Sequence, residues 1–430
     1  MASPERSLWR HRDFMLLWGG QTVSEIGSSV TFLAFPLLAV KTLHASTFQV
    51  ALLSVATSAA FLLIALPAGA WVDRWRRKRV LVRSDLGRLL LVGSVPVAQA
   101  LGVLTLAQLY VVALASSVLS VFFDVAYQSY LPEVVDADQL IDGNGKLGTT
   151  QSFAQVAGPG VGGALVGLVG APYAVAVDAV SYLVSGGATA AIRRPDPVPV
   201  AKAQRQRLRA DIREGLTFVT GHPVLSRIVG CTGTSNFGSA MAGAVEVVFL
   251  VRTLHASSLV VGLVFSLGSV GGILGGLSAG WIARRVGSAR TIWLSVLVTA
   301  PFAFLGPLSF AGPGVLLLSL GSFVVIFGAV VYNVAQVSYR QAICPPRLLG
   351  RMNASVRFIV WGSMPLGALA GGGLASLTSP RLTLVVGGVI ALSACLFVIR
   401  SPLFGLRDVP MEPPEPVLPT EAAAEAPVPV

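Results

Sequence analysis

Charged residues are scarce in this chain of 430 residues. Only 12% of the residues are Asp, Glu, Lys or Arg, whereas 54% are hydrophobic and the mean hydropathy is +0.75. Globular domains carry about 25% charged residues, so this chain has too little polar surface to cover a soluble protein of its length. The composition therefore excludes a soluble globule and predicts a protein that lies within a lipid bilayer.

Several chemical signatures are also missing from the sequence. The three cysteines, Cys231, Cys344 and Cys395, lie far apart and form neither a metal-binding spacing nor a disulfide framework. A G-x-x-x-x-G-K-[ST] loop that would cradle nucleotide phosphates does not occur, and Ser, His and Asp form no nucleophile elbow. We therefore expect no cofactor, no metal site, no built-in ATP motor and no enzymatic activity.

The net charge of +11 does not indicate a nucleic-acid partner. The basic residues cluster at the ends of apolar runs and are not interleaved with aromatic side chains that stack on bases. Twelve such runs are long enough to cross a hydrocarbon core of ~30 Å as helices. Their expected ranges are 14–40, 48–72, 80–101, 106–130, 146–169, 172–192, 224–251, 257–282, 291–310, 313–338, 353–377 and 382–400.

The loops between these runs alternate in charge. Basic residues gather after the second, sixth, eighth and tenth runs, whereas the other loops hold only Lys41, Arg252 and Arg381. Because basic loops remain in the cytoplasm, both termini are predicted to be cytoplasmic in a multi-pass protein of a bacterial-type cell (inner) membrane.

The two halves of the chain repeat each other at an offset of 211 positions. The segment from Val40 to Ser46 matches that from Val251 to Ser257, and the basic stretch that begins at Gly69 returns in eroded form from Gly280. Repeats of this kind are typical of transporters, in which two related halves move about a central site. The repeated histidines, His44 and His255, are expected to mark a turn before a serine N-cap, with pH sensing as the alternative.

The repeat divides the chain into parts. We expect an N-terminal six-helix bundle over 1–192 and a C-terminal six-helix bundle over 224–402. The segment 193–223 between them is predicted to be a cytoplasmic linker that contains an amphipathic helix. The Pro-, Glu- and Ala-rich end, 403–430, is expected to be a disordered cytoplasmic tail.

The loop after the second run has the form G-x-x-x-D-R-x-x-R-[KR]-[KR], with Arg76 at a position that is usually Gly. It resembles the signature loop of the major facilitator superfamily. The resemblance implies that its aspartate faces the N-terminus of the eleventh helix and latches the two halves on the cytoplasmic side. A plain positive-inside loop is the alternative. The gating residues that the resemblance implies, together with an acid on the fourth run expected to pair with the loop arginines, are Gly69, Asp73, Arg74, Arg77, Lys78 and Asp124.

The fifth run contains a Gly- and Pro-rich segment, from Ala157 to Gly163. It is similar to the motif of antiporter members of the superfamily, and it favours export over uptake. By this resemblance the fifth and eighth helices pack closely across the interface between the halves, with ordinary small-residue packing as the alternative. The residues concerned are Gly145, Gly158, Pro159, Gly162 and Gly163 on the fifth run and Gly268, Gly272 and Gly276 on the eighth.

The first run, from Phe14 to Gly27, resembles the subgroup that contains the enterobactin exporter and macrolide efflux proteins, and the likeness extends over nearly the whole chain. Many members carry an acid directly after the glycine, where this chain has Ser28. Glu25, one turn earlier, is a candidate to take over that role.

Carboxylates inside the predicted spans are functional candidates, because a charge there costs ~2.5–3.5 kcal/mol on insertion scales. Glu25 and Glu246 are expected at similar depths of the first helix of each half, and Asp178 on the sixth run is the further candidate for proton or substrate coupling. The alternative is that they pair with backbone or solvent near a helix end. Asp85 and Arg88 are expected to form a local ion pair.

Together these features predict an all-α membrane protein with twelve transmembrane helices in two pseudo-twofold-related six-helix bundles. The expected function is secondary active transport by alternating access, as a proton-coupled antiporter that exports a small amphipathic molecule such as a drug or a siderophore. The expected partners are the small-molecule substrate, protons and the lipid bilayer, with no nucleic acid and with the monomer as the working unit. An uptake permease for a sugar or metabolite is the alternative, and a membrane sensor or polytopic enzyme is a remote one.

Overall fold

The computed structural model describes residues 8–72, 74–136, 139–194, 208–345 and 348–408. Within these ranges the chain is helical and contains no strand. The long helices are α1 (Arg12–Lys41), α2 (Thr47–Val72), α3 (Arg77–Ala100), α4 (Leu106–Val134), α5 (Leu140–Val169), α6 (Ala171–Ala190), α8 (Pro223–Val248), α9 (Ser258–Val286), α10 (Ser288–Thr299), α11 (Val315–Ile343), α12 (Leu349–Leu377) and α13 (Pro380–Ser393).

Each of the twelve predicted spans has a helix at its place, and the predicted all-helical, two-bundle fold is confirmed. Ten helical segments among the described residues are long and apolar enough to cross a membrane. The two others are α3, which carries Asp85 and several basic residues, and α6, which contains Asp178 and several Ser, Thr and Gly residues. The two helices pack against each other, and their polar residues Asp85, Arg88 and Asp178 are buried within the protein.

Some spans are not continuous α-helices. α10 changes into a 3₁₀-helix over Ala300–Leu305, at Pro301, which has no backbone N–H to donate. α8 ends in a π-helical turn over Phe249–Thr253, and the last span is divided into α13 and the short α14 (Cys395–Ile399). Between the two halves, α7 (Leu208–Gly221) forms the helix expected in the linker.

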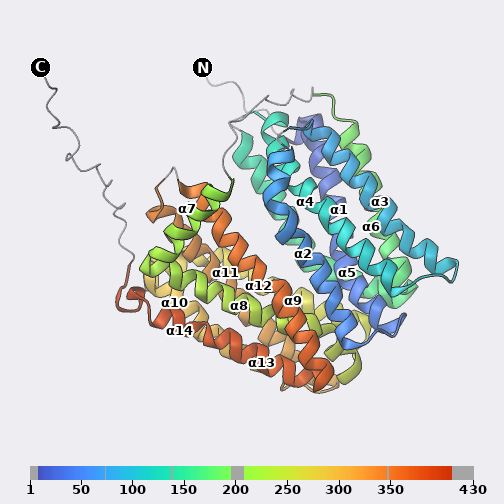
Figure 1. Ribbon diagram of the computed structural model, residues 1–430. Helices are drawn as coiled ribbons and strands as arrows, with labels where there is room; N and C mark the ends of the chain where they lie inside the picture. Colours follow the sequence, from blue (N-terminus) through green and yellow to red (C-terminus); the bar gives the residue numbers. More distant parts are fainter. Residues whose placement is uncertain (1–7, 73, 137–138, 195–207, 346–347, 409–430) are drawn as a thin grey trace, which may run out of the picture.

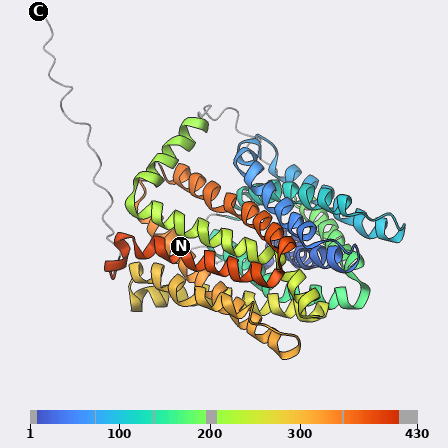
Figure 2. The same cartoon turned by 60° about the horizontal axis from the view of Figure 1, so that its bottom comes forward.

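The helices form two groups that follow the order of the chain (Figure 1). α1 to α6 form the N-terminal half and α8 to α14 the C-terminal half, and the same two groups are seen after rotation (Figure 2). Most of the basic residues lie at one end of both groups, at the starts of α1, α3, α10 and α12 and at the ends of α9 and α11. We call this end the basic face and the other end the opposite face.

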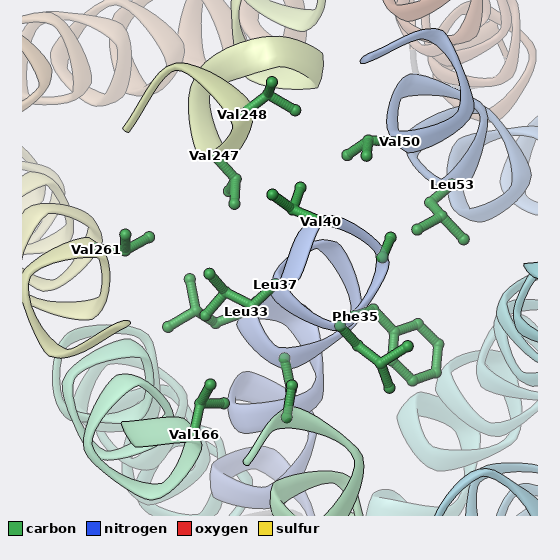
Figure 3. Close-up of a cluster of buried hydrophobic side chains, with 14 of the residues drawn as sticks. Leu33, Phe35, Leu37, Val40, Val50, Leu53, Val166, Val247, Val248 and Val261 are labelled. Carbon is green, nitrogen blue, oxygen red and sulfur yellow. The ribbon is translucent and has the colours of Figure 1, made fainter. Parts of the chain in front are cut away.

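The two halves share one hydrophobic core toward the opposite face. The last turns of α1, with Leu33, Leu37 and Val40, lie between Val166 of α5 and Val247 of α8 (Figure 3). Val30, Leu33, Leu37 and Leu38 are fully buried there. Because residues of both halves contribute to this core, opening the opposite face would expose apolar surface to water.

Near the basic face the cores are separate. One cluster, which includes Phe14, Leu81 and Tyr130, contains residues of the N-terminal half. Two further clusters contain C-terminal residues, one around Leu225 and Ile292 and the other including the linker helix α7. The halves are therefore held together by a common core toward the opposite face, while each has its own core at the basic face.

The repeated loops bridge the halves at the opposite face. Lys41 Nζ donates to Ser258 Oγ at 2.9 Å, and Arg252 Nη2 donates to the carbonyl oxygen of Ala45 at 2.6 Å. Lys41 and Arg252 are equivalent in the repeat, and each donates one hydrogen bond into the other half.

The repeated histidines occupy the same unusual backbone conformation. His44 and His255 have φ angles of 50° and 53°, in the left-handed region that few residues other than glycine adopt. Two residues later in each repeat, Ser46 Oγ accepts from Gln49 N and Ser257 Oγ accepts from Val260 N, both at 3.3 Å. The prediction of a turn followed by a serine cap is confirmed.

The end of the described chain is more ordered than the predicted tail. Leu403 is buried, the Phe404 ring contacts Trp293, and Asp408 Oδ1 accepts from Ser288 N at 2.9 Å. The first residues of the segment 403–430 therefore pack on α10, because the tail begins with apolar residues that have a surface to cover. Residues 409–430 lie outside the described residues.

Candidate functional site

A polar pocket of about 520 Å³ lies within the N-terminal half. It is lined by the middle of α1, by Arg88 of α3, by the later half of α4 and by the first half of α5. It therefore lies in the part of the bundle nearer the basic face. The polar residues that line it are Gln21, Ser24, Glu25, Ser28, Arg88, Ser120, Asp124, Tyr127, Gln128, Asn144, Thr150 and Gln151.

Glu25 is one of two carboxylates in the pocket wall. Gln21, one turn earlier on α1, donates from Nε2 to Glu25 Oε1 at 2.8 Å. The donor is an uncharged amide, so the hydrogen bond orients the carboxylate without compensating its charge. The side chain is half-buried, and the carboxylate is accessible from the pocket.

Asp124 is the second carboxylate, and its surroundings differ from the expectation. Arg77 forms its ion pair with Glu133, in the last turn of α4, and not with Asp124. Asp124 lies more than two turns earlier on the same helix, where it is exposed to the pocket. Glu133 and Asp124 lie on one helix, and the depth of α4 in the bundle decides which of them meets α3.

Arg88 is the basic residue of the pocket, and its charge is compensated. Arg88 Nη2 lies 2.5 Å from Asp85 Oδ1, and Asp85 is fully buried, so the expected local ion pair is confirmed. The guanidinium also lies 4.4 Å from the ring centroids of Phe123 and Tyr182. Two aromatic faces and a carboxylate thus hold Arg88 at the pocket wall as a structural cation.

Asp178 lies behind the pocket, fully buried on α6. Ser28 Oγ is 3.4 Å from Asp178 Oδ1 and 2.9 Å from the Tyr182 hydroxyl. The close approach of α1 to α6 requires Gly27, since a Cβ there would lie 2.8 Å from Asp178 Oδ1. Ser28 therefore connects the pocket with the buried carboxylate.

Glu246 does not belong to this pocket. It lies two residues from the end of α8, near the opposite face, whereas Glu25 lies in the first half of α1. The expectation of similar depths is wrong, because the repeat places Asn236 at the position of Glu25. Asn236 Nδ2 donates to the carbonyl oxygen of Val360 on α12 at 3.3 Å.

The model of the transmembrane secretion effectors, a family of the major facilitator superfamily, matches residues 5–426. The chain belongs to this family.

Named relatives and solved structures agree with this assignment. The multidrug efflux pump Tap of Mycolicibacterium fortuitum is 28% identical over 361 residues, which cover 81% of this chain and 86% of that protein. The enterobactin exporter EntS of Salmonella choleraesuis is 23% identical over 418 residues, with coverage of 93% and 95%. The crystal structure of a bacterial homologue of the iron transporter ferroportin, in an inward-facing state, shares the fold with a TM-score of 0.69, 18% identity and coverage of 92% and 99%.

The superfamily's signature loop lies at the basic face. α2 ends at Val72 and α3 begins at Arg77. Arg76 has φ −68° and ψ 115°, an ordinary extended conformation, and the turn therefore does not need glycine there. Lys78 Nζ donates to the carbonyl oxygen of Ile192 at 2.6 Å, which joins the start of α3 to the end of α6.

The expected latch includes Asp73, Gly69 and Arg74. Asp73 lies outside the described residues. Gly69 lies within α2, where its surroundings are not described, and Arg74 is exposed in the turn after that helix. The latch through Asp73 therefore remains a prediction.

The antiporter-type glycines divide between two kinds of contact. α5 and α9 do pack together across the halves: a Cβ on Gly163 would lie 3.0 Å from Gly262 Cα, and Gly160 N donates to Ser266 Oγ at 2.9 Å. Gly158 and Gly162 instead face α1, at Ser29 and Val30. Gly145 has open space around it, and Pro159 is buried with its carbonyl oxygen against Gly262.

The glycine row of α9 has a different partner from the one expected. Gly268 and Gly272 face Ile326 of α11, and Gly276 faces Val330 of the same helix. The row is therefore a packing surface within the C-terminal half, and α9 meets α5 through Gly262. Small residues indicate that a neighbour comes close, but they do not specify which neighbour.

The sequence reasoning also missed part of the site. Tyr127 and Gln128 line the pocket beside Asp124, and polar residues spaced along α4 were the available signal.

The repeat also places His11 and His222 at equivalent positions. His11 Nδ1 accepts from Phe14 N at 3.1 Å and His222 Nδ1 from Val224 N at 3.2 Å, so both cap the first helix of a half.

Proposed function

We propose that this chain, a transporter of the major facilitator superfamily, exports a cationic amphipathic molecule from the cytoplasm in exchange for protons, by alternating access. The observation that carries this proposal is the pocket of the N-terminal half, in which two carboxylates, Glu25 and Asp124, are accessible while the one arginine is already paired. The names of relatives that pump out drugs or a siderophore support export as the direction.

The basic face is the cytoplasmic one in this proposal. Arginines and lysines at helix ends remain on the cytoplasmic side during membrane insertion, and the opposite face holds few basic residues. A shared core toward the opposite face and separate cores at the basic face then correspond to a state open to the cytoplasm. An exporter receives its cargo in this state.

The charge and shape of the pocket favour a cation with an apolar body. Asp85 compensates Arg88, so Glu25 and Asp124 leave the pocket negative when ionised. Phe123 and Tyr127 on α4 add aromatic surface beside them, and aromatic faces attract cations as well as apolar groups. A catecholate siderophore carries negative charge, which these carboxylates would repel, and we therefore place the drug-like cation first.

Proton coupling follows from competition for the same carboxylates. A bound proton removes the charge that holds a cation, and a bound cation disfavours the proton. By linkage the two effects are equal in magnitude. We assume that the protein changes between its inward-open and outward-open states readily only when it holds either a proton or the cargo. One proton then enters for each cargo molecule exported.

Transport by purified protein in proteoliposomes tests the proposal. With an inward-directed pH gradient across correctly oriented protein, we expect uphill movement of ethidium, a cationic dye, and no movement of the anionic dye carboxyfluorescein. Glu25→Gln and Asp124→Asn should each lower gradient-driven ethidium transport by about tenfold or more, since one charge contact at a partly buried site contributes on the order of 1.5–3 kcal/mol.

The matched control is Asp142→Asn. Asp142 is an exposed carboxylate of α5 paired with Lys146 and lies outside the pocket, so its loss should leave transport unchanged. Full gradient-driven transport by both pocket variants would refute the role of the pocket. Preferential movement of carboxyfluorescein would refute the preference for a cationic substrate. Accumulation of a nutrient in cells would favour the uptake permease.

A further inference from the structure

A second pocket, of about 530 Å³, lies on the outer side of the N-terminal half at the basic face. It is formed where the start of α3 meets the end of α6. The basic residues that line it are Arg76, Lys78, Arg79, Arg83 and Arg194. No carboxylate of the described residues lines this pocket.

Two acids at the end of α4 and just beyond it approach this region in space, and both already have partners. Glu133 pairs with Arg77, and Asp136 Oδ1 accepts from Arg194 Nη2 at 3.4 Å. Lys78 is directed to the carbonyl oxygen of Ile192. Arg76, Arg79 and Arg83 have no ion pair among the described residues and thus leave the pocket strongly positive.

An apolar stripe continues from the pocket along the membrane-facing side of both helices. On α3 it runs from Val82, which lines the pocket, to Leu86 and Leu90, which are 52% and 67% exposed. These residues are four apart, so they lie on one face of the helix. On α6 the exposed residues Leu183 and Val180 follow Ala190 in the same direction. A positive pocket thus lies at the end of an exposed apolar stripe.

The internal repeat shows what the corresponding place in the other half contains. α10 begins at Ser288, the repeat equivalent of Arg77, and Ser288 N donates to the carboxylate of Asp408 at 2.9 Å. Trp293, the equivalent of Val82, is covered by the Phe404 ring at 4.9 Å between centroids. In the C-terminal half the chain itself therefore supplies an anion and an apolar group at this position.

We propose that the pocket of the N-terminal half binds the phosphate headgroup of an anionic phospholipid, whose acyl chains lie along the stripe of Leu86, Leu90, Val180 and Leu183. Arginine guanidinium groups donate paired hydrogen bonds to phosphate oxygens. Basic pockets between helices on the cytoplasmic side suit such headgroups. The stripe decides for a lipid over a soluble phosphate compound, since a soluble ligand would not use it.

The positive-inside rule alone does not account for this arrangement. It requires basic residues at the basic face, which the C-terminal half also provides in Arg284 and Arg290. It requires neither a hollow between two helices nor an apolar stripe that leads into it. These two basic residues consequently offer a matched control with equal loss of charge.

The test measures lipid bound to the purified full-length chain. The protein is delipidated in a neutral detergent and titrated with phosphatidylglycerol or phosphatidylcholine, and bound lipid is counted by native mass spectrometry. The pocket variant carries Arg79→Gln with Arg83→Gln, and the control carries Arg284→Gln with Arg290→Gln. The melting temperature without lipid shows that both variants are folded.

The unchanged protein and the control are expected to bind phosphatidylglycerol alike and to prefer it to phosphatidylcholine. The pocket variant should bind it about 25-fold more weakly, at roughly fivefold for each basic residue lost near a headgroup. Leu86→Asn with Leu90→Asn should also weaken binding while leaving all charges in place.

Equal titration curves for the pocket variant and the control would overturn the proposal. That result is also expected if an acid of the chain itself filled the pocket, for which Asp196, outside the described residues, is the nearest in sequence. An equal preference for phosphatidylcholine would exclude the anionic headgroup. Stabilisation by inorganic phosphate that matches stabilisation by phosphatidylglycerol would exclude the lipid.

Discussion

The two faces of the protein are built from the same repeated sequence but differ in how the halves meet. At the opposite face, each half has a short loop with the sequence Leu-His-Ala-Ser. Lys41 and Arg252, which precede these loops, donate hydrogen bonds into the other half. At the basic face, the charges are more numerous, and the ion pair of Arg77 with Glu133 stays within the N-terminal half. Whether a basic residue links the two halves therefore depends on which half provides its hydrogen-bond or ion-pair partner.

This difference indicates how charge placement and gating are related. Arginines of both halves repel one another when the basic face closes, and closure therefore needs acidic partners at that face. The opposite face holds fewer charges and combines their hydrogen bonds with a large apolar core. Residues that orient the protein in the membrane consequently also influence which face is open.

The largest effect is expected where the halves touch backbone to backbone. Gly163→Leu should reduce transport by tenfold or more, because a side chain there meets Gly262 and Ser258 of α9, and overpacking costs ~1–3 kcal/mol. Gly167→Leu, one turn later on α5, is the control, since nothing lies within 4 Å of that position. Ethidium transport and the amount of protein in the membrane are measured for both. Equal transport by the two variants would show that transport does not depend on the α5–α9 contact between the halves.

The cross-half hydrogen bonds should have the next largest effect. Lys41→Gln combined with Arg252→Gln should shift the population toward the state open at the opposite face, by about fivefold for each contact of ~1 kcal/mol. Spin labels at Val103 and Leu308, exposed sites in different halves, report the distance across that face. Arg381→Gln is the control, because Arg381 donates to Ser309 within its own half. An unchanged distance distribution in the double variant would show that the core alone holds the face closed.

Asp73 tests the other side of the comparison. If it closes the basic face by meeting the N-terminus of α12, Asp73→Asn removes a contact of ~0.3–2 kcal/mol that exists only in the state closed at that face. Transport should then fall severalfold while the protein remains in the membrane, with Asp142→Asn as the control. A normal transport rate for Asp73→Asn would indicate that the loop serves only to orient the protein in the membrane.

The smallest effect concerns His222, which caps α8 at the basic face. Burial lowers the pKa of its imidazole from 6.5, so the unfolded chain binds the proton first as the pH falls. The stabilisation is complete above pH 6.5 and is lost as the pH falls through the folded-state pKa. His222→Asn keeps a cap without a titrating group and should remove about 1–3 °C of the drop in melting temperature between pH 7.5 and 5.5. An identical drop in both proteins would assign the pH dependence to other groups.

Much of the fold follows from local features of the sequence. The length of an apolar run decides whether a helix can cross the bilayer, and basic residues in the loops separate the two faces, so the twelve long helices, α1 to α6 and α8 to α13, lie where the runs predicted them. The repeat of Val40 to Ser46 likewise predicted a common turn, and His44 and His255 adopt one conformation. These properties depend on a few neighbouring residues and on the hydrophobic effect, and need no knowledge of the other helices.

The partners of individual side chains were decided only by the tertiary structure. Gly272 faces α11 and not α5, Arg77 meets Glu133 and not Asp124, and Glu246 lies far from the depth of Glu25. Each of these outcomes depends on the rotation of a helix about its axis and on its shift along the membrane normal. Packing of the whole bundle sets both quantities, because a helix with small or apolar residues on several sides has more than one face that can be buried. The sequence by itself determined which helices form and on which side their charges lie, and the packing determined which acids line the pocket.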